Sequence, residues 1–264
     1  KKLFDVVKNP KPGMPKDNSK KYNKQLIIWE KESNDLNEFS NYMPPGYGRP
    51  IDTNDNSWRP DDSIFGGFWE GGKHWSEVIT DDAIEFINDS QNFQNPFFMY
   101  LAFNAPHDPR QAPKRFLDMY PIENISLPIN YTPQHPYMYE IGNDPGLRDE
   151  ALAPYPRSEY AVKKHLQEYY AIISHLDEQV GKVISHLENK KLLNNTYIIF
   201  TSDHGLSVGQ HGLIGKQSLY DHSIRVPMII SGPKIKPNSS FSSDVYLQDI
   251  VPTTYDLANL PIPE

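Results

Sequence analysis

The stretch that decides the fold reads YIIFTSDHG and covers residues 197–205. Its first four residues are β-branched or aromatic, which is typical of a buried strand, and a polar turn follows at once. In open α/β sheets, ligands bind just beyond the carboxyl ends of the strands. Asp203 and His204 therefore stand where such a fold usually carries its chemistry.

The residues after this turn add further reactive groups. His211 and Lys216 belong to the glycine-rich run GQHGLIGK at 209–216. A carboxylate suits a cation, whereas Lys and His suit a negatively charged substrate. Calcium prefers oxygen ligands, and imidazole suits zinc, iron or manganese. Asp203 fits either class of metal, and direct ligation by His204 would favour the softer class.

A second strand end carries another histidine. The run PFFMYLAF at 96–103 predicts a buried strand, and the polar segment NAPHDP at 104–109 follows it. His107 is either a histidine packed between prolines or a donor to a substrate or leaving-group oxygen, the usual task of histidine near neutral pH.

The surrounding pattern predicts an α/β fold. Ser158 is a good helix cap, and apolar residues spaced by three or four predict one helix from there to Asn189. The strand at 197–202 follows directly, so helix and strand form half of a crossover unit. Another strand is expected at 226–230. We predict a largely parallel central sheet flanked by helices.

Two more helices complete this pattern. One is expected to open at Thr80, because a threonine cap precedes two acidic residues that suit the helix dipole. The other is expected at 248–259, with Pro252 tolerated in its first turn.

The domain organisation predicted is one catalytic-type segment over 1–264. Residues 1–76 are expected to be mostly loop, with one strand near 25–29, and residues 77–264 form the α/β core. Within that core, 110–157 carries scattered prolines and predicts a variable excursion over the surface. The chain starts and stops abruptly, so we expect an internal segment of a longer protein, with a fold incomplete at both ends.

Composition excludes several classes of function. The net charge is −8 without blocks of either sign, which argues against nucleic-acid and membrane-surface partners. No apolar run approaches the roughly 20 residues that a membrane span needs. The chain has no cysteine, so it contains no disulfide, no thiolate metal ligand and no cysteine nucleophile.

Taken together, these motifs resemble the type I sulfatases of the alkaline phosphatase superfamily. The resemblance is carried by IFTSDHG at 199–205, GQHGLIGK at 209–216, SLYD at 218–221 and IRVP at 224–227. LAFNAPH at 101–107 resembles that family's second histidine motif. DIVPTT at 249–254 and LANL at 257–260 are similar to its usual late helix.

The resemblance implies hydrolysis of a sulfate ester that depends on one calcium ion and on a formylglycine nucleophile made from Cys or Ser. It implies that Asp203 and His204 are metal ligands. Lys216 and His107 would be catalytic and bind the sulfate, and His211 would lie between a supporting role and a substrate contact. A periplasmic, secreted or lysosome-like compartment is expected for the same reason.

The sequence departs from the family in one important way. The family's Cys/Ser-x-Pro/Ala-x-Arg nucleophile motif, its early paired aspartates and its His-x-Gly-Lys motif do not occur here. We expect the remainder of the same polypeptide to supply them, and the segment alone to be inactive.

Two other functions stay open. An Asp-His-Gly after a strand also serves two-metal phosphoesterases, so a phosphodiesterase or phosphonate monoester hydrolase is an alternative. A non-catalytic protein that binds a sulfated glycan is another. The substrate expected for a sulfatase is a sulfated saccharide or another small organic sulfate, contacted by 1–76 and 110–157.

Overall fold

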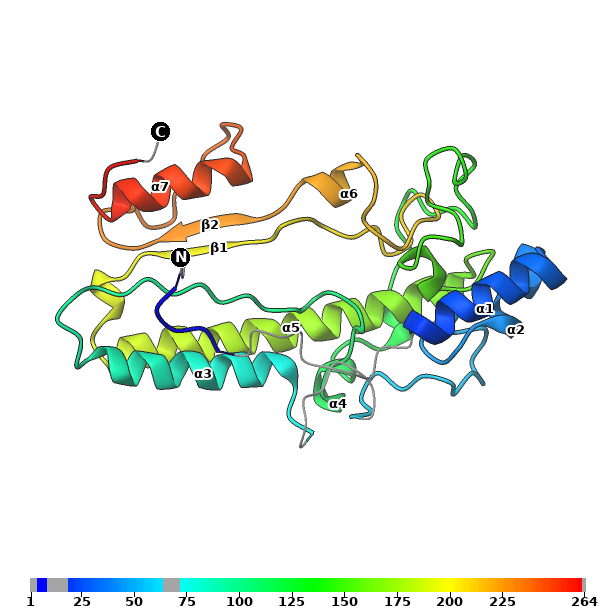
Figure 1. Cartoon of the computed structure of the whole chain (residues 1–264), viewed down its shortest axis with the longest axis horizontal. Helices are drawn as coiled ribbons and strands as arrows, with labels where there is room; N and C mark the ends of the chain where they lie inside the picture. Colours follow the sequence, from blue (N-terminus) through cyan, green and yellow to red (C-terminus); the bar gives the residue numbers. More distant parts are fainter. Residues whose placement is uncertain (1–3, 9–18, 64–71, 263–264) are drawn as a thin grey trace.

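The computed structural model describes residues 4–8, 19–63 and 72–262. Its longest element is helix α5 (Glu159–Asn189), which runs along the molecule in Figure 1. The Ser158 side chain accepts a hydrogen bond from the Ala161 N–H at 3.1 Å and so begins the helix as predicted. Val162, Leu176 and Leu187 lie on the predicted apolar stripe and are all buried. The predicted cap and end of this helix are confirmed, and so is the stripe except at Ile173, which is 37% exposed while its neighbour Ile172 is buried.

Helix α3 (Trp75–Ser90) packs against the C-terminal half of α5. It begins five residues before the predicted Thr80 cap, because the His74 side chain accepts from the Ser76 N–H at 3.1 Å. Thr80 lies inside the helix, where its hydroxyl donates to the Ser76 carbonyl. The predicted start at Thr80 is therefore wrong.

The sheet found among the described residues has two strands. β1 (Ile198–Thr201) and β2 (Met228–Ser231) pair antiparallel, with Ile199 opposite Ile230. Both lie where strands were predicted, and the chain is a mixture of helix and sheet. The two strands are antiparallel because residues 202–227 reverse the direction of the chain between them, so that β2 pairs with β1. It is not the largely parallel sheet predicted.

Residues 97–103 are extended but have no assigned ladder. Phe97, Met99 and Leu101 pack towards α3 and α5, while Phe98 and Tyr100 are 60% and 71% exposed. This alternation is that of a strand with one face covered. The segment runs in the same direction as β1 in Figure 1. A strand assignment needs a hydrogen-bonded neighbour, and the described residues do not supply one.

The N-terminal part contains more helix than predicted. Helix α1 (Ser19–Glu32) includes the predicted strand at 25–29, which is wrong. Tyr22, Leu26 and Trp29 recur at helical spacing and face one core cluster with Phe39. Short helices η1 (Leu36–Glu38) and α2 (Phe39–Tyr42) follow. Residues 1–3, 9–18 and 64–71 of the predicted loop region lie outside the described residues.

The excursion at 110–157 has little regular structure, with only α4 (Lys114–Leu117), η2 (Ile122–Asn124) and η3 (Glu150–Leu152). Phe116 and Leu117 nevertheless pack on α5, and Met138 and Tyr155 join the core beside α1. The segment is therefore partly core, not only surface. The remaining elements are η4 (Leu193–Asn195), α6 (Asp221–Ile224), η5 (Leu247–Asp249) and α7 (Ile250–Leu257).

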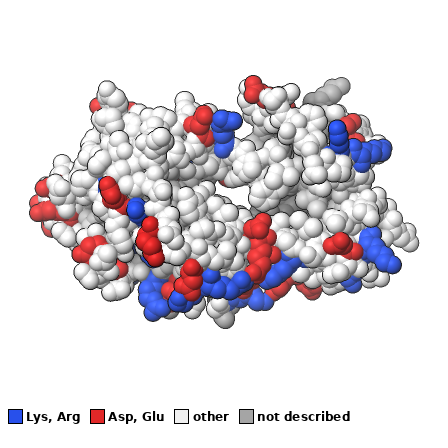
Figure 2. Space-filling model, turned by 180° about the vertical axis from the view of Figure 1, so that it is seen from behind, with Lys and Arg blue, Asp and Glu red and all other residues white. Residues whose placement is uncertain are grey.

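Charged side chains of both signs are mixed on the surface, as expected for a sequence without blocks of like charge. Figure 2 shows Lys, Arg, Asp and Glu side chains of both signs interspersed along the lower edge of one face, with large uncharged areas above. Within the described ranges, none of the helices has the length and apolarity needed to cross a membrane.

Candidate active site

The chain after β1 folds into a hairpin, residues 207–215, that we call the site hairpin. The Ser207 N–H donates to the Gly215 carbonyl at 2.9 Å, and the Gly209 N–H donates to the Leu213 carbonyl at 2.7 Å. Gly209 has φ +101°, and a Cβ there would lie 2.3 Å from Val162 Cγ1 of α5. Only glycine allows this close contact, which seats the hairpin on α5.

Lys216 leaves the end of the site hairpin and meets His107, 109 positions earlier in the chain. Lys216 Nζ donates to His107 Nε2 at 2.8 Å. A lysine ammonium has no acceptor, so Nε2 must carry a lone pair and Nδ1 must carry the proton. That proton is donated to the Asp108 carbonyl at 2.8 Å. The imidazole in this arrangement is neutral and presents Nε2 to the lysine.

Acidic groups surround this pair. Asp108 Oδ1 lies 3.1 Å from His107 Nδ1, and Asp149 Oδ2 lies 3.6 Å from Lys216 Nζ. Burial by itself would raise the pKa of Asp149, but the hydrogen bond from Gln217 and the charges of Arg148 and Lys216 outweigh it and lower that pKa. The structure therefore favours an ionised Asp149 carboxylate beside the Lys216 ammonium.

A second carboxylate fixes the backbone just before Lys216. Glu150 is fully buried and accepts from the N–H groups of Ile214 and Gly215 at 2.9 and 2.8 Å. It also forms a 2.8 Å ion pair with the buried Arg157. These contacts hold the last residues of the site hairpin, so the direction in which Lys216 leaves it is fixed.

Asp203 and His204 lie together at the end of β1. The Asp203 carboxylate is 84% exposed, and its Oδ2 lies 3.4 Å from His204 Nε2. His204 Nδ1–H donates to the Gly205 carbonyl at 3.1 Å, which leaves Nε2 free to ligate. A Cβ on Gly205 would lie 2.0 Å from the His222 carbonyl, so this turn also needs glycine.

A metal site would need more than these two donors. No group of three or more His, Cys, Asp or Glu suited to a metal occurs among residues 4–8, 19–63 and 72–262. Calcium takes six to eight oxygen ligands. The exposed Asp203 carboxylate and the adjacent His204 imidazole could fill one side of a metal coordination shell. The other side would need further ligands.

His211 occupies a different position. It lies at the tip of the site hairpin with φ +54°, whereas Lys216 lies at the open end. Its ring stacks on Tyr220 with centroids 4.1 Å apart, and Asn130 Nδ2 donates to its Nε2 at 2.9 Å. His135 Nε2 lies 3.0 Å from the Tyr220 hydroxyl. The structure thus brings His107 and Lys216 together and pairs Asp203 with His204, and it places His211 in an aromatic cluster.

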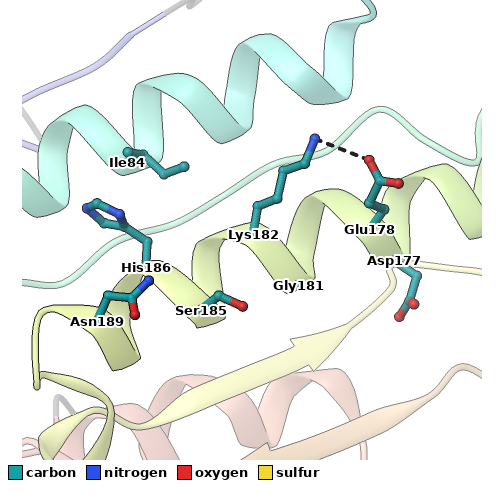
Figure 3. Close-up of a pocket in the computed structure, with 8 residues that line it drawn as sticks. All are labelled: Ile84, Asp177, Glu178, Gly181, Lys182, Ser185, His186 and Asn189. Carbon is teal, nitrogen blue, oxygen red and sulfur yellow. Dashed lines mark ion pairs between the residues drawn. The ribbon is translucent and has the colours of Figure 1, made fainter.

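An open groove of about 580 Å³ lies elsewhere, between α3 and the later turns of α5 (Figure 3). Lys182 there pairs with Glu178 at 3.2 Å, and His186 Nε2 lies 3.0 Å from Asn88 Oδ1. These polar groups satisfy one another. The residues of α5 that line the groove lie roughly 20–40 Å along the helix from Val162, where the site hairpin packs. We interpret it as solvated helix surface.

The residues that sequence reasoning missed are Arg148, Asp149, Glu150 and Gln217. The triplet at 148–150 stands in a proline-rich stretch and looks like a solvated turn. Asp108 could have been found, because an aspartate directly after a histidine at a strand end can orient that histidine.

Comparison with known proteins gives a consistent picture. The family model described as Sulfatase matches residues 18–260. Iduronate 2-sulfatase of Mus musculus is 34% identical over 218 residues, which cover 70% of this chain and 40% of that protein. Arylsulfatase K of Xenopus laevis is 31% identical over 204 residues, covering 72% of this chain and 37% of that protein.

Two solved structures show the same relationship. A Bacteroides fragilis protein, provisionally assigned as a sulfatase, is 30% identical with a TM-score of 0.56, covering 73% of this chain and 39% of that one. A phosphonate monoester hydrolase of Silicibacter pomeroyi has a TM-score of 0.65 at 22% identity, covering 92% of this chain and 47% of that one, which shows a shared fold. The matched part of this chain spans 30% to 40% of the length of four curated relatives, two of them the iduronate 2-sulfatase and the arylsulfatase K named above.

Proposed function

Because this chain belongs to the sulfatase family, we propose that the protein containing it hydrolyses sulfate esters. Water is consumed, the bond between sulfur and the ester oxygen breaks, and an alcohol and inorganic sulfate are released. The observation that carries the proposal is the 2.8 Å contact between Lys216 Nζ and His107 Nε2. It places the Lys216 ammonium and the His107 imidazole side by side, so that a cation and a group able to transfer protons can act on one anionic ester.

The two residues take complementary roles in this proposal. The Lys216 ammonium offsets negative charge on the sulfate oxygens, an effect that is strongest in a site that excludes water. His107 takes up a proton from solvent at Nε2, donates a hydrogen bond through it to a sulfate oxygen, and then gives that proton to the departing alcohol oxygen. Asp108 supports this role because it accepts from Nδ1 and keeps Nε2 towards the substrate.

The metal and the nucleophile are also part of the proposal. Asp203 and His204 would hold one face of a calcium ion, and a formylglycine in the polypeptide outside these 264 residues would supply the nucleophile. The calcium ion supplies positive charge at the sulfate when bound. The exposed Asp203 carboxylate supports this assignment, because it lies open to further ligands.

We propose a sulfated saccharide as the substrate, with other small organic sulfates as the wider class. Relatives named iduronate 2-sulfatase and N-acetylglucosamine-6-sulfatase support the saccharide. His211 would contact the organic part of the substrate rather than the sulfate, because it lies at the tip of the site hairpin beside Tyr220. A periplasmic, secreted or lysosome-like compartment would give access to such substrates, and a relative named as an extracellular sulfatase supports it.

The test is sulfate release by the complete polypeptide that contains this chain. A panel of sulfated mono- and disaccharides and choline sulfate is incubated with the protein, and free sulfate is measured by ion chromatography. Release that stops on calcium chelation supports the proposal. Hydrolysis of phosphodiesters with two bound zinc ions would replace it by the phosphoesterase alternative, and glycan binding without any release would replace it by the non-catalytic one.

A further inference from the structure

Three consecutive charged residues, 148–150, contact both the His107 side and the Lys216 side of the candidate site. Arg148 Nη1 donates to Asp108 Oδ2 at 2.6 Å, beside His107. Asp149 forms an ion pair with Lys216, and Glu150 accepts from the N–H groups directly before Lys216. Arg148 also pairs with Asp149, so the triplet is continuous. We call residues 148–150 the clasp.

The Asp149 carboxylate is itself held in place. Its side chain is only 7% exposed, and Gln217 Nε2 donates to its Oδ2 at 2.9 Å. Gln217 Oε1 accepts from the Lys216 N–H at 3.0 Å, so one side chain bridges the carboxylate and the lysine backbone. A carboxylate with a fixed position can in turn fix the position of a flexible ammonium group.

Lysine needs such a constraint more than most residues. Its ammonium sits on a flexible four-carbon stem. In this site it is directed by two groups, the lone pair of His107 Nε2 at 2.8 Å and the Asp149 carboxylate at 3.6 Å. Once a substrate binds His107 Nε2, the Asp149 carboxylate is the group among the described residues that still holds the ammonium.

We propose that Asp149 is a positioning residue that holds the Lys216 ammonium beside His107, with Arg148 linking it to Asp108 on the histidine side. This inference rests on the proposed function of Lys216 and His107. Asp149 does not touch the substrate in this arrangement. It acts through Lys216, and a misplacement of a charged group by about 1 Å can cost on the order of 100-fold in rate.

The test uses the complete polypeptide with the variants Asp149→Asn, Asp149→Glu and Asp118→Asn. Asp118 is an exposed aspartate of the same excursion that pairs only with Lys114 in the described structure, so it controls for loss of a charge. Kinetics are measured with 4-nitrophenyl sulfate. We expect Asp149→Asn to lower kcat by about 10- to 100-fold, with partial rescue by Asp149→Glu and no change for Asp118→Asn.

A second readout does not depend on catalysis. Each protein is briefly treated with an amine-acetylating reagent, and acetylation of Lys216 and Lys114 is compared by mass spectrometry. We expect Lys216 to react several times faster in Asp149→Asn than in the unsubstituted protein, with Lys114 unchanged in this variant. If Asp149→Asn does not fold by circular dichroism, Gln217→Met replaces it, with a smaller expected loss of kcat of about 5-fold.

The outcomes separate the two proposals. A kcat within about 2-fold of the unsubstituted protein, together with unchanged Lys216 labelling, would overturn the positioning role even if sulfate esters are hydrolysed. An increase in Lys216 labelling in a protein that hydrolyses no sulfate ester would uphold the positioning of Lys216 and reject the proposed function. A loss of stability with kcat unchanged in the folded protein would also overturn positioning, because it marks a purely structural role.

Discussion

Glu150 and Arg157 form an ion pair of 2.8 Å in which both side chains are completely buried. Removing one charge leaves the other buried without a counter-charge, at a cost of about 3–5 kcal/mol. We expect Glu150→Gln to lower the free energy of unfolding by that amount in urea titrations. Asp221→Asn is the control, because its pair with Arg225 is 78% exposed on both sides and contributes about 1 kcal/mol or less. Equal effects of the two substitutions would contradict the assigned burial.

Replacing Lys216 by alanine removes the cation that we assign to the sulfate. Loss of one such group typically lowers kcat by about 100- to 1,000-fold. We expect a decrease of this size in the complete polypeptide, measured as release of sulfate at saturating substrate. Lys114→Ala, at an exposed lysine of α4, should leave kcat unchanged. A decrease of less than about 10-fold for Lys216→Ala would count against a catalytic role.

The buried histidine pair His74 and His175 makes stability depend on pH. Their ring centroids are 4.4 Å apart, and burial lowers the pKa of each to about 4. Between pH 4 and 6.5 the unfolded chain therefore binds more protons than the folded one. The contribution of these histidines to the free energy of unfolding should be at its maximum above pH 6.5. It should fall as the pH drops towards 4, by up to about 3 kcal/mol per histidine.

His74→Asn tests this directly, because asparagine can cap α3 but does not titrate. We expect the slope of unfolding free energy against pH to become shallower in this window, whatever the absolute stability of the variant. Guanidinium titrations at half-unit pH steps give that slope. A slope equal to that of the unsubstituted protein would show that His74 does not contribute to it.

Replacing Asp203 by asparagine should weaken calcium binding by the complete polypeptide by at least about 10-fold, because the charged ligand is lost. Isothermal titration calorimetry after chelation and dialysis measures the affinity. His204→Asn replaces an imidazole nitrogen by an amide oxygen, which calcium also accepts as a ligand, and should have a smaller effect on calcium binding. If zinc rather than calcium restores activity after chelation, the calcium assignment is wrong.

Gly209 cannot carry a side chain without disturbing α5. Its positive φ costs about 1–2 kcal/mol for another residue, and the contact with Val162 adds about 1–3 kcal/mol of overpacking. We expect Gly209→Ala to destabilise the chain by the sum of these in thermal melts. Val162→Ala removes the colliding methyl groups, so the double substitution should cost less than the two single ones together.

Sequence reasoning was most successful where one local pattern decides the outcome. Ser158 and the apolar stripe behind it were enough for α5, and β1 and β2 lie within a residue or two of their predicted bounds. It failed at α1, where QLIIW at 25–29 resembles a strand. The burial of Tyr22 and Trp29 on one helical face decides in favour of helix, and that depends on contacts with Phe39.

The candidate site divides in the same way. His107 and Lys216, whose side chains meet in the structure, could be chosen from the sequence because both stand in recognisable motifs. The clasp has no such motif. Its function depends on contacts with Asp108, Lys216 and the backbone at 214–215, which come from distant parts of the chain, and the spacing along one sequence cannot reveal them.

The position of the clasp at one end of the excursion sets a limit on loop exchange. A chimera that takes 110–157 from another enzyme, in order to acquire its substrate range, would also exchange the groups behind Lys216 and the Glu150–Arg157 pair. Grafts that stop before Arg148 would leave these groups in place. Donor loops can therefore be exchanged only upstream of that residue, and only where they keep apolar residues at the core positions 116, 117 and 138.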